Sequence, residues 1–150
     1  MAETERLRVF FDADVLIAGS LSATGASHVL LHLAELGVIE GVTSPQALRE
    51  AEENLRRKLP IALPAFRVIR SSSLGREVDP APSHLRAAEG RAHPDDVPIL
   101  AAALTADCDY LVTHNTRHYR TAGMACRATA PGPLVARIRR LLAKMGDWDA

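Results

Sequence analysis

The chain has 150 residues, a length that suits one domain, so we expect a single domain over residues 1–150. Eighteen basic residues balance eighteen acidic ones, and this formal net charge of zero excludes a protein that attracts nucleic acid through a global positive field. Two distant cysteines exclude a disulfide framework, and we expect both to be buried and reduced.

The first predicted elements are a strand and a helix. Residues 7–11 are β-branched and aromatic and end at a polar residue, so they are predicted to form a buried strand. The apolar character continues until the Gly-Ser pair at 19–20, which is expected to break it. Ser27 is predicted to cap a helix over residues 28–36, with Gly37 as its stop.

A second helix has the clearest start signal in the chain. Ser44 at the N-cap and Pro45 at the first helical position predict a helix that runs to about Lys58. Pro60 stops it. The segment 60–70 is compatible with a helix, or with a helix followed by a strand.

The second half of the chain continues the alternation. Ser83 is predicted to cap a short helix to Glu89, and Asp95 is predicted to cap a helix that ends near Asp107. Three further elements are predicted by their apolar patterns: a strand over 110–113, a last strand over 126–129 and a helix from 131 onward. Strands that alternate with helices predict an α/β fold with a mostly parallel sheet covered on both faces.

Signals for secretion or membrane insertion are not visible in these elements. The apolar stretch at residues 7–11 is too short for a signal peptide and is followed at once by acids. The longest apolar runs fall well short of the roughly 20 residues needed to span a bilayer. We therefore expect a cytoplasmic protein with no membrane partner.

Polar residues collect where the predicted strands end. Asp12 and Asp14 follow the first strand, and Asn115 follows the strand at 110–113. Asp95 and Asp96 start a helix, which in such a fold lies at the same edge of the sheet. Carboxylates that crowd together repel unless a cation neutralises them, and Mg²⁺ prefers such oxygen ligands. The sequence therefore indicates a metal site at this edge.

Four runs of the chain, in order, resemble the motifs of the PIN-domain (PilT N-terminus) family: residues 9–17, 44–55, 93–104 and 109–119. The match in order and spacing extends from about residue 7 to 143. The resemblance implies a three-layer α/β/α sandwich that is often dimeric. It also implies an endoribonuclease that uses Mg²⁺ or Mn²⁺, and many such proteins are toxins neutralised by an antitoxin protein.

The resemblance assigns catalytic roles to four residues. Asp12 is similar to the family's first metal ligand, Glu50 to its second acid and Asp96 to its third acid, and Asp12 and Asp96 are expected to hold the ion. Asn115 stands at the fourth position, where it adds an amide oxygen but no charge. This departure puts the binding of a second ion in question.

Five neighbouring residues are candidates for support or for RNA contact. Asp14 is expected either to orient the surroundings of Asp12 or to close a turn, and Thr113 is expected to assist through its hydroxyl. Arg117 and Arg120 are candidate phosphate contacts, which a neutral chain needs locally, and His118 is either a loop contact or an RNA contact.

Three functions are compatible with this pattern. The first is a metal-dependent endoribonuclease, of the toxin type that the resemblance implies, in which a metal-bound hydroxide attacks the phosphodiester. The second is a PIN fold that has lost activity and binds RNA or a protein partner. The third is a phosphotransferase of the haloacid-dehalogenase type, with Asp12 as the nucleophile. In that family the acidic pair follows the Ser/Thr strand end, whereas here residues 95 and 96 precede Thr113.

Overall fold

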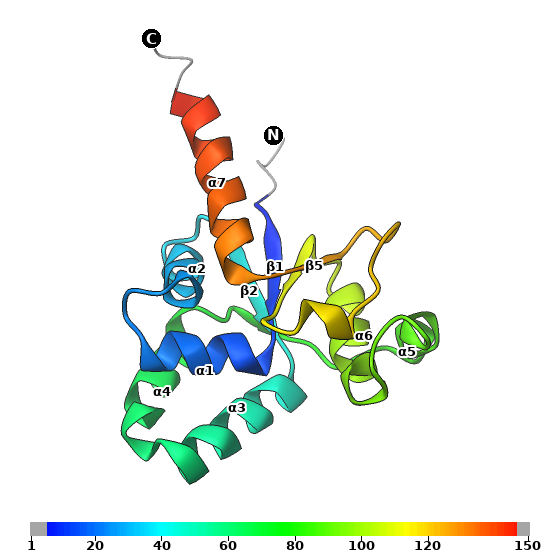
Figure 1. Ribbon diagram of the computed structural model, residues 1–150, viewed down its shortest axis with the longest axis horizontal. Helices are drawn as coiled ribbons and strands as arrows, with labels where there is room; N and C mark the ends of the chain where they lie inside the picture. The colour runs from blue at the N-terminus through cyan, green and yellow to red at the C-terminus, as the bar shows by residue number, and fades with distance from the viewer. Residues whose placement is uncertain (1–5, 147–150) are drawn as a thin grey trace.

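The computed structural model describes residues 6–146, and its centre is a five-stranded, all-parallel sheet (Figure 1). The strand order is β3-β2-β1-β4-β5, so the first strand lies in the middle. The predicted ends of the domain, residues 1–5 and 147–150, lie outside the described residues. The strands are β1 (Arg8–Phe11), β2 (Glu40–Thr43), β3 (Arg76–Glu77), β4 (Tyr110–Val112) and β5 (Arg127–Thr129).

Helices cover both faces of the sheet, which confirms the predicted α/β/α sandwich. One face carries α1 (Ala13–Leu21), α2 (Ala26–Glu35), α3 (Pro45–Lys58), α4 (Leu63–Ser72) and α7 (Pro131–Gly146). The other face carries α5 (Pro82–Ala88) and α6 (Val97–Thr105). Three short 3-10 helices complete the described chain: η1 (Pro60–Ala62), η2 (Pro94–Asp96) and η3 (Thr116–His118).

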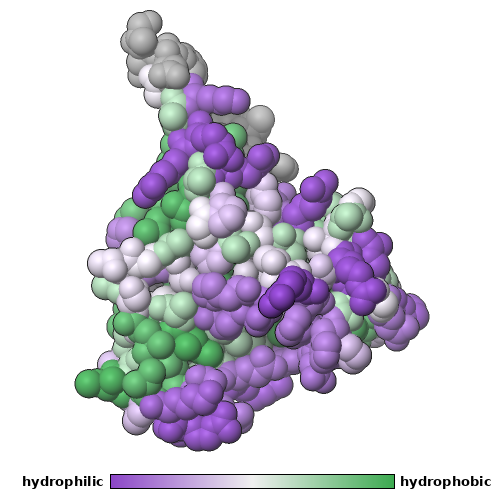
Figure 2. Space-filling view, in the orientation of Figure 1, coloured by the Kyte–Doolittle hydropathy of each residue, from purple (hydrophilic) through white to green (hydrophobic). Residues whose placement is uncertain are grey.

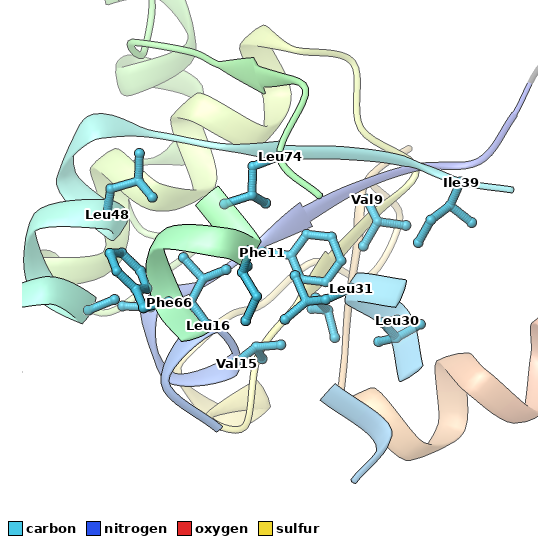
Figure 3. Close-up of a cluster of buried hydrophobic side chains, with 14 of the residues drawn as sticks. Val9, Phe11, Val15, Leu16, Leu30, Leu31, Ile39, Leu48, Phe66 and Leu74 are labelled. Atoms are coloured by element: carbon cyan, nitrogen blue, oxygen red, sulfur yellow. The ribbon is translucent and has the colours of Figure 1, made fainter. Parts of the chain in front are cut away.

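The central strand β1 contributes side chains to two hydrophobic cores. Val9 and Phe11 point into the larger core beside Leu16, Leu31 and other apolar side chains of the covering helices (Figure 3). Phe10 points to the opposite face, where it meets α6. Because side chains alternate along a strand, a shift of one residue would expose or misplace all three. The two cores therefore fix where β1 ends.

Several predicted boundaries are confirmed. Ser44 caps α3 by accepting a hydrogen bond from the Ala47 backbone N–H, and the helix ends at Lys58. Gly37 has a positive φ of 79°, the conformation expected just after a helix. The segment 60–70 is helical throughout, formed by η1 and most of α4, so the first of the two predicted alternatives is confirmed. The short strand β3 lies beyond this segment, at Arg76–Glu77.

The predicted break at 19–20 is wrong, because α1 runs through both residues. Gly19 lies where α1 meets α2, and a Cβ at this position would collide with the Leu31 side chain. Ser20 keeps its hydroxyl satisfied by donating to the Leu16 carbonyl at 2.7 Å. The glycine allows close helix packing here rather than ending a helix.

Three predicted helix caps are also wrong. Helix α2 begins after Gly25, and Ser27 is buried inside it. Helix α5 begins at Pro82 after Ala81, so Ser83 lies within the helix. Asp95 caps no helix, and its side chain is 92% exposed; η2 begins instead after His93, whose ring accepts a bond from the Asp95 backbone N–H.

None of the described helices is long and apolar enough on its own to cross a bilayer. By length and composition alone, α1 and α2 meet that test only as a pair, across a bend of 96°.

The prediction for the two cysteines is confirmed, because Cys108 and Cys126 are both buried free thiols.

The carboxyl ends of three neighbouring strands are tied together. The Asp12 backbone N–H donates to the Val112 carbonyl at 3.1 Å, which joins the end of β1 to the end of β4. The Thr43 hydroxyl donates to the Phe11 carbonyl at 3.0 Å, which joins β2 to β1. The chain continues from β1 to β2 and β3 on one side and later crosses to β4 and β5 on the other. In open α/β sheets, ligands bind at such a switch point.

Gly41 of β2 lies in close contact with the backbone of a neighbouring segment. A Cβ at this position would collide with the backbone carbonyl of Ser73, which cannot move like the end of a side chain. We expect Gly41→Ala to lower the free energy of unfolding by about 1–3 kcal/mol, as measured by urea titration. Gly132→Ala is the matched control, because its Cβ would meet open space. Equal stability of the Gly41 variant and the wild type would contradict this account.

Candidate active site

Asp12 lies at the centre of the carboxyl edge, directly after β1. Its side chain caps α1, with Oδ1 accepting a hydrogen bond from the Ala13 backbone N–H at 2.8 Å. Oδ2 accepts a hydrogen bond from the Tyr119 hydroxyl at 3.0 Å. The residue is 8% exposed. The carboxylate is therefore held in one orientation from both sides.

Burial makes the ionised form of Asp12 costly. The pKa of Asp12 is raised from 3.8 to about 6, first because burial disfavours the charge and second because Asp14 repels it. The hydrogen bonds from Ala13 and Tyr119 act in the opposite direction without cancelling this effect. The site thus holds a negative charge that its own surroundings do not fully neutralise.

Asp14 lies in the first turn of α1 and connects that helix to the loop after β4. Its Oδ2 accepts three hydrogen bonds: from the Thr113 hydroxyl at 3.3 Å, from the His114 backbone N–H at 3.0 Å and from Asn115 Nδ2 at 3.1 Å. Its Oδ1 is buried and has no hydrogen-bond partner among the described residues. Burial also raises the pKa of Asp14.

Glu50 and Asp96 approach the same edge from the helices on the two faces. Glu50 is exposed on α3, and its Oε1 accepts a hydrogen bond from Gln46 Nε2 at 3.0 Å. The same amide nitrogen lies 3.5 Å from the carbonyl oxygen of Asp95, so α3 contacts η2. Asp96 Oδ2 lies 3.0 Å from the Nδ1 of His118.

Tyr119 shows which of the predicted acids share one neighbourhood. Burial raises the pKa of its hydroxyl, and nearby carboxylates raise it further. Those carboxylates belong to Asp12, Asp96 and Asp14. Three of the acids therefore act on one buried hydroxyl, while Glu50 reaches this edge through its contact with Gln46.

The acids fit a hard divalent cation without forming a finished cage. Within residues 6–146, no group of three His, Cys, Asp or Glu side chains is close enough to hold an ion by itself. Mg²⁺ and Mn²⁺ prefer oxygen ligands, and Mg²⁺ keeps several waters, so a few carboxylates suffice. A cation would give the unpartnered Oδ1 of Asp14 an interaction partner, and it would stabilise the ionised form of Asp12, which burial and Asp14 disfavour.

The predicted supporting residues have different surroundings. Thr113 is fully buried, and besides donating to Asp14 it accepts a hydrogen bond from the Asn115 backbone N–H at 3.1 Å. His118 contacts Asp96, and its ring stacks on His93 with 5.4 Å between the centroids. The structure thus shows a contact of His118 within the protein, and a role of His118 in RNA contact stays a prediction.

The two predicted phosphate contacts lie close to these groups. Arg117 belongs to η3, directly before His118, and Arg120 follows Tyr119. Both side chains are exposed. A role for either arginine in RNA contact stays a prediction.

Two residues of this site were not among the predicted ones. Tyr119 is the last residue of the run 109–119, and its hydroxyl was the available signal, because the hydroxyl of a buried tyrosine needs a hydrogen-bond partner. Gln46 lies one helical turn before Glu50, which places the two on one face of α3. Nothing in the sequence distinguishes Gln46 from an ordinary exposed glutamine.

Fold and site together define an α/β protein with an acidic site at the carboxyl edge of a parallel sheet. A family profile described as the PIN domain matches residues 8–117. The chain therefore belongs to the PIN-domain family, which has a nuclease-type fold and whose members typically depend on divalent metals. A comparison with curated proteins found no match.

The raised pKa of Asp12 predicts how stability depends on pH. Between pH 3.8 and about 6 the folded protein binds a proton that the unfolded chain has already lost, so stability falls as pH rises through this window. Asp12→Asn removes this pH-dependent loss of stability, because an asparagine side chain does not ionise. We expect the variant to be less than about 1 kcal/mol more stable than wild type near pH 4 and about 3 kcal/mol more stable near pH 7.5.

Urea titrations in metal-free buffer measure this difference. Titrating groups that do not interact with Asp12 contribute equally to both proteins and cancel, whereas Asp14 is repelled by Asp12 and contributes to the difference. A stability difference that does not change between these two pH values would contradict a raised pKa for Asp12.

Proposed function

We propose that this protein is a metal-dependent endoribonuclease that hydrolyses RNA phosphodiester bonds. The observation that carries the proposal is the buried carboxylate of Asp12 beside Asp14, at the switch point of a PIN-domain sheet. Adjacent acids in a buried setting destabilise a fold, and groups perturbed in this way cluster at functional sites. A phosphodiester adds negative charge at the same place, so positive charge is needed there.

Asp12 and Asp96 are the proposed ligands of Mg²⁺ or Mn²⁺, and Glu50 completes the acidic set directly or through a water molecule. When bound, such an ion supplies an activated water at neutral pH and neutralises charge on the phosphate. Polar contacts from neighbouring residues hold these carboxylates in place. Asp12 is held by Ala13 and Tyr119, and Asp96 by His118.

These contacts matter because catalysis depends on position. Groups that orient ligands in advance avoid an entropic cost when the substrate binds. The Tyr119 hydroxyl and the α1 backbone fix the Asp12 rotamer, and the His118 ring restrains Asp96. The proposed role of Thr113 and Asn115 is to hold Asp14 and thus the loop after β4.

RNA is the proposed substrate, with Arg117 and Arg120 as phosphate contacts. The net charge of zero gives no long-range attraction, so such contacts must be local. Both arginines flank the segment that holds His118 and Tyr119, which contact the proposed ligands. Contact between these two side chains and the RNA backbone is part of the proposal.

The biological setting extends the proposal. A cytoplasmic location fits two buried free thiols, since reduced cysteines are usual there. Figure 2 shows hydrophobic residues gathered over α1 and α4. The exposed apolar residues of these and the neighbouring elements include Leu21 of α1, Ile61 of η1 and Val68 of α4. Such a patch supports pairing of two copies. The toxin role and an antitoxin partner stay predictions.

One alternative retains specific support. A PIN fold that only binds RNA or protein is favoured by the uncharged Asn115 and by the lack of a ready three-ligand cluster within residues 6–146. The haloacid-dehalogenase alternative is not favoured, because the chain belongs to a family with a nuclease-type fold.

Asp12→Asn tests the proposed nuclease directly. We expect Mn²⁺-dependent cleavage of a fluorescent single-stranded RNA to fall by more than about 100-fold, since changing even the partners of a metal ligand typically costs 10–100-fold. Circular dichroism should show an unchanged fold. Full activity in this variant would refute the assignment, and an inactive wild type with no Mn²⁺ binding would favour the binding module.

Glu50→Gln, compared with Glu53→Gln, tests the second acid. Both glutamates are exposed on α3, and both variants keep the side-chain shape while removing one charge. We expect cleavage to fall about tenfold or more for Glu50→Gln and to stay near the wild-type rate for Glu53→Gln. Equal rates for the two variants would show that Glu50 has no special role.

A further inference from the structure

We propose that Asp14 and Asn115 form an exchanged acid–amide pair, in which Asp14 supplies to the cation the charge that position 115 lacks. Asn115 then acts as the positioning residue for this carboxylate. The inference rests on the proposed function and adds Asp14 to the residues that bind the ion.

The hydrogen bonds of Asp14 are the first observation. All three of its donors, from Thr113, His114 and Asn115, converge on Oδ2, while the buried Oδ1 has none. The Nδ1 of His114 lies 3.7 Å from Oδ1, beyond hydrogen-bond distance. A buried carboxylate oxygen without a partner is costly, and such exceptions call for a ligand or an ion. The carboxylate is thus oriented on one side and unsatisfied on the other.

The second observation is the position of the pair. Asp14 follows β1 and Asn115 follows β4, and these strands are neighbours at the switch point. The two side chains are 101 residues apart in sequence and joined by a contact of 3.1 Å. Moving the charge from one side chain to the other therefore displaces it by about the length of one hydrogen bond.

Electrostatics explains why only one member of the pair is an acid. Two carboxylates in direct contact cannot both ionise without raising one another's pKa. A carboxylate paired with an amide keeps the charge and gains a hydrogen bond. Asn115 is then a compensated departure from the family pattern rather than the loss of an acid.

The competing explanation is that Asp14 only anchors the loop at 113–115. Asp14→Asn separates the two explanations, because the asparagine oxygen accepts the same three hydrogen bonds while the charge disappears. Asp14→Ala removes both the charge and the anchor. A purely structural role predicts full Mn²⁺ affinity for the asparagine variant and loss of stability only for the alanine variant.

Isothermal titration calorimetry with MnCl₂ on the full chain tests the proposal. We expect Asp14→Asn to weaken Mn²⁺ binding by about tenfold or more, and the double variant Asp14→Asn/Asn115→Asp to recover to within about threefold of wild type. Asp95→Asn is the matched control, since it removes an exposed carboxylate at the same edge. Urea titration without metal checks that each variant is folded.

Each outcome decides the matter. Wild-type Mn²⁺ affinity in Asp14→Asn overturns the proposal while leaving the nuclease assignment intact. A double variant as weak as Asp14→Asn overturns the exchange between the two positions. A wild-type protein that binds no Mn²⁺ overturns the nuclease assignment and this inference together. Weak binding in Asp14→Asn with recovery in the double variant supports the exchange.

Discussion

The parallel pairing of β1 with β4 is the constraint on which the rest of the site depends. The register places Phe11 beside Val112, and the Asp12 backbone N–H donates to the Val112 carbonyl. The residues that follow β1 and the residues that follow β4 therefore lie together at one edge of the sheet. Two hydrophobic cores hold this register, because Phe10 and Phe11 point to opposite faces and are both fully buried. A slip of one residue would reverse both side chains and would also separate the acids from the loop after β4.

Electrostatic strain at this edge connects stability to function. Asp12 is buried with a raised pKa, and Asp14 has a buried oxygen without a partner. Both features destabilise the protein in the absence of a cation, and both suit a site that binds one. The surrounding hydrogen bonds orient the carboxylates without neutralising them. This arrangement costs some stability and leaves unneutralised negative charge at the carboxyl edge of the sheet.

The formal net charge of zero limits how this chain can attract a negatively charged substrate. A protein with no global positive field must neutralise substrate charge locally. In the proposed function, a bound ion at the acidic edge and the exposed Arg117 and Arg120 would supply this local positive charge.

The sequence by itself determined most of the elements, though not α1 or β3, and the edge at which the acids lie. Local patterns are sufficient for this, because β1 and the Ser44-Pro45 helix start carry their own signals, and strand ends in a parallel sheet share one edge. Only the tertiary structure decided which side chains meet. The continuation of α1 through Gly19 depends on Leu31 of another helix, and the hydrogen bond between Tyr119 and Asp12 joins residues 107 apart. Local propensity contains no information about such partners, since packing and desolvation arise only when distant segments come together.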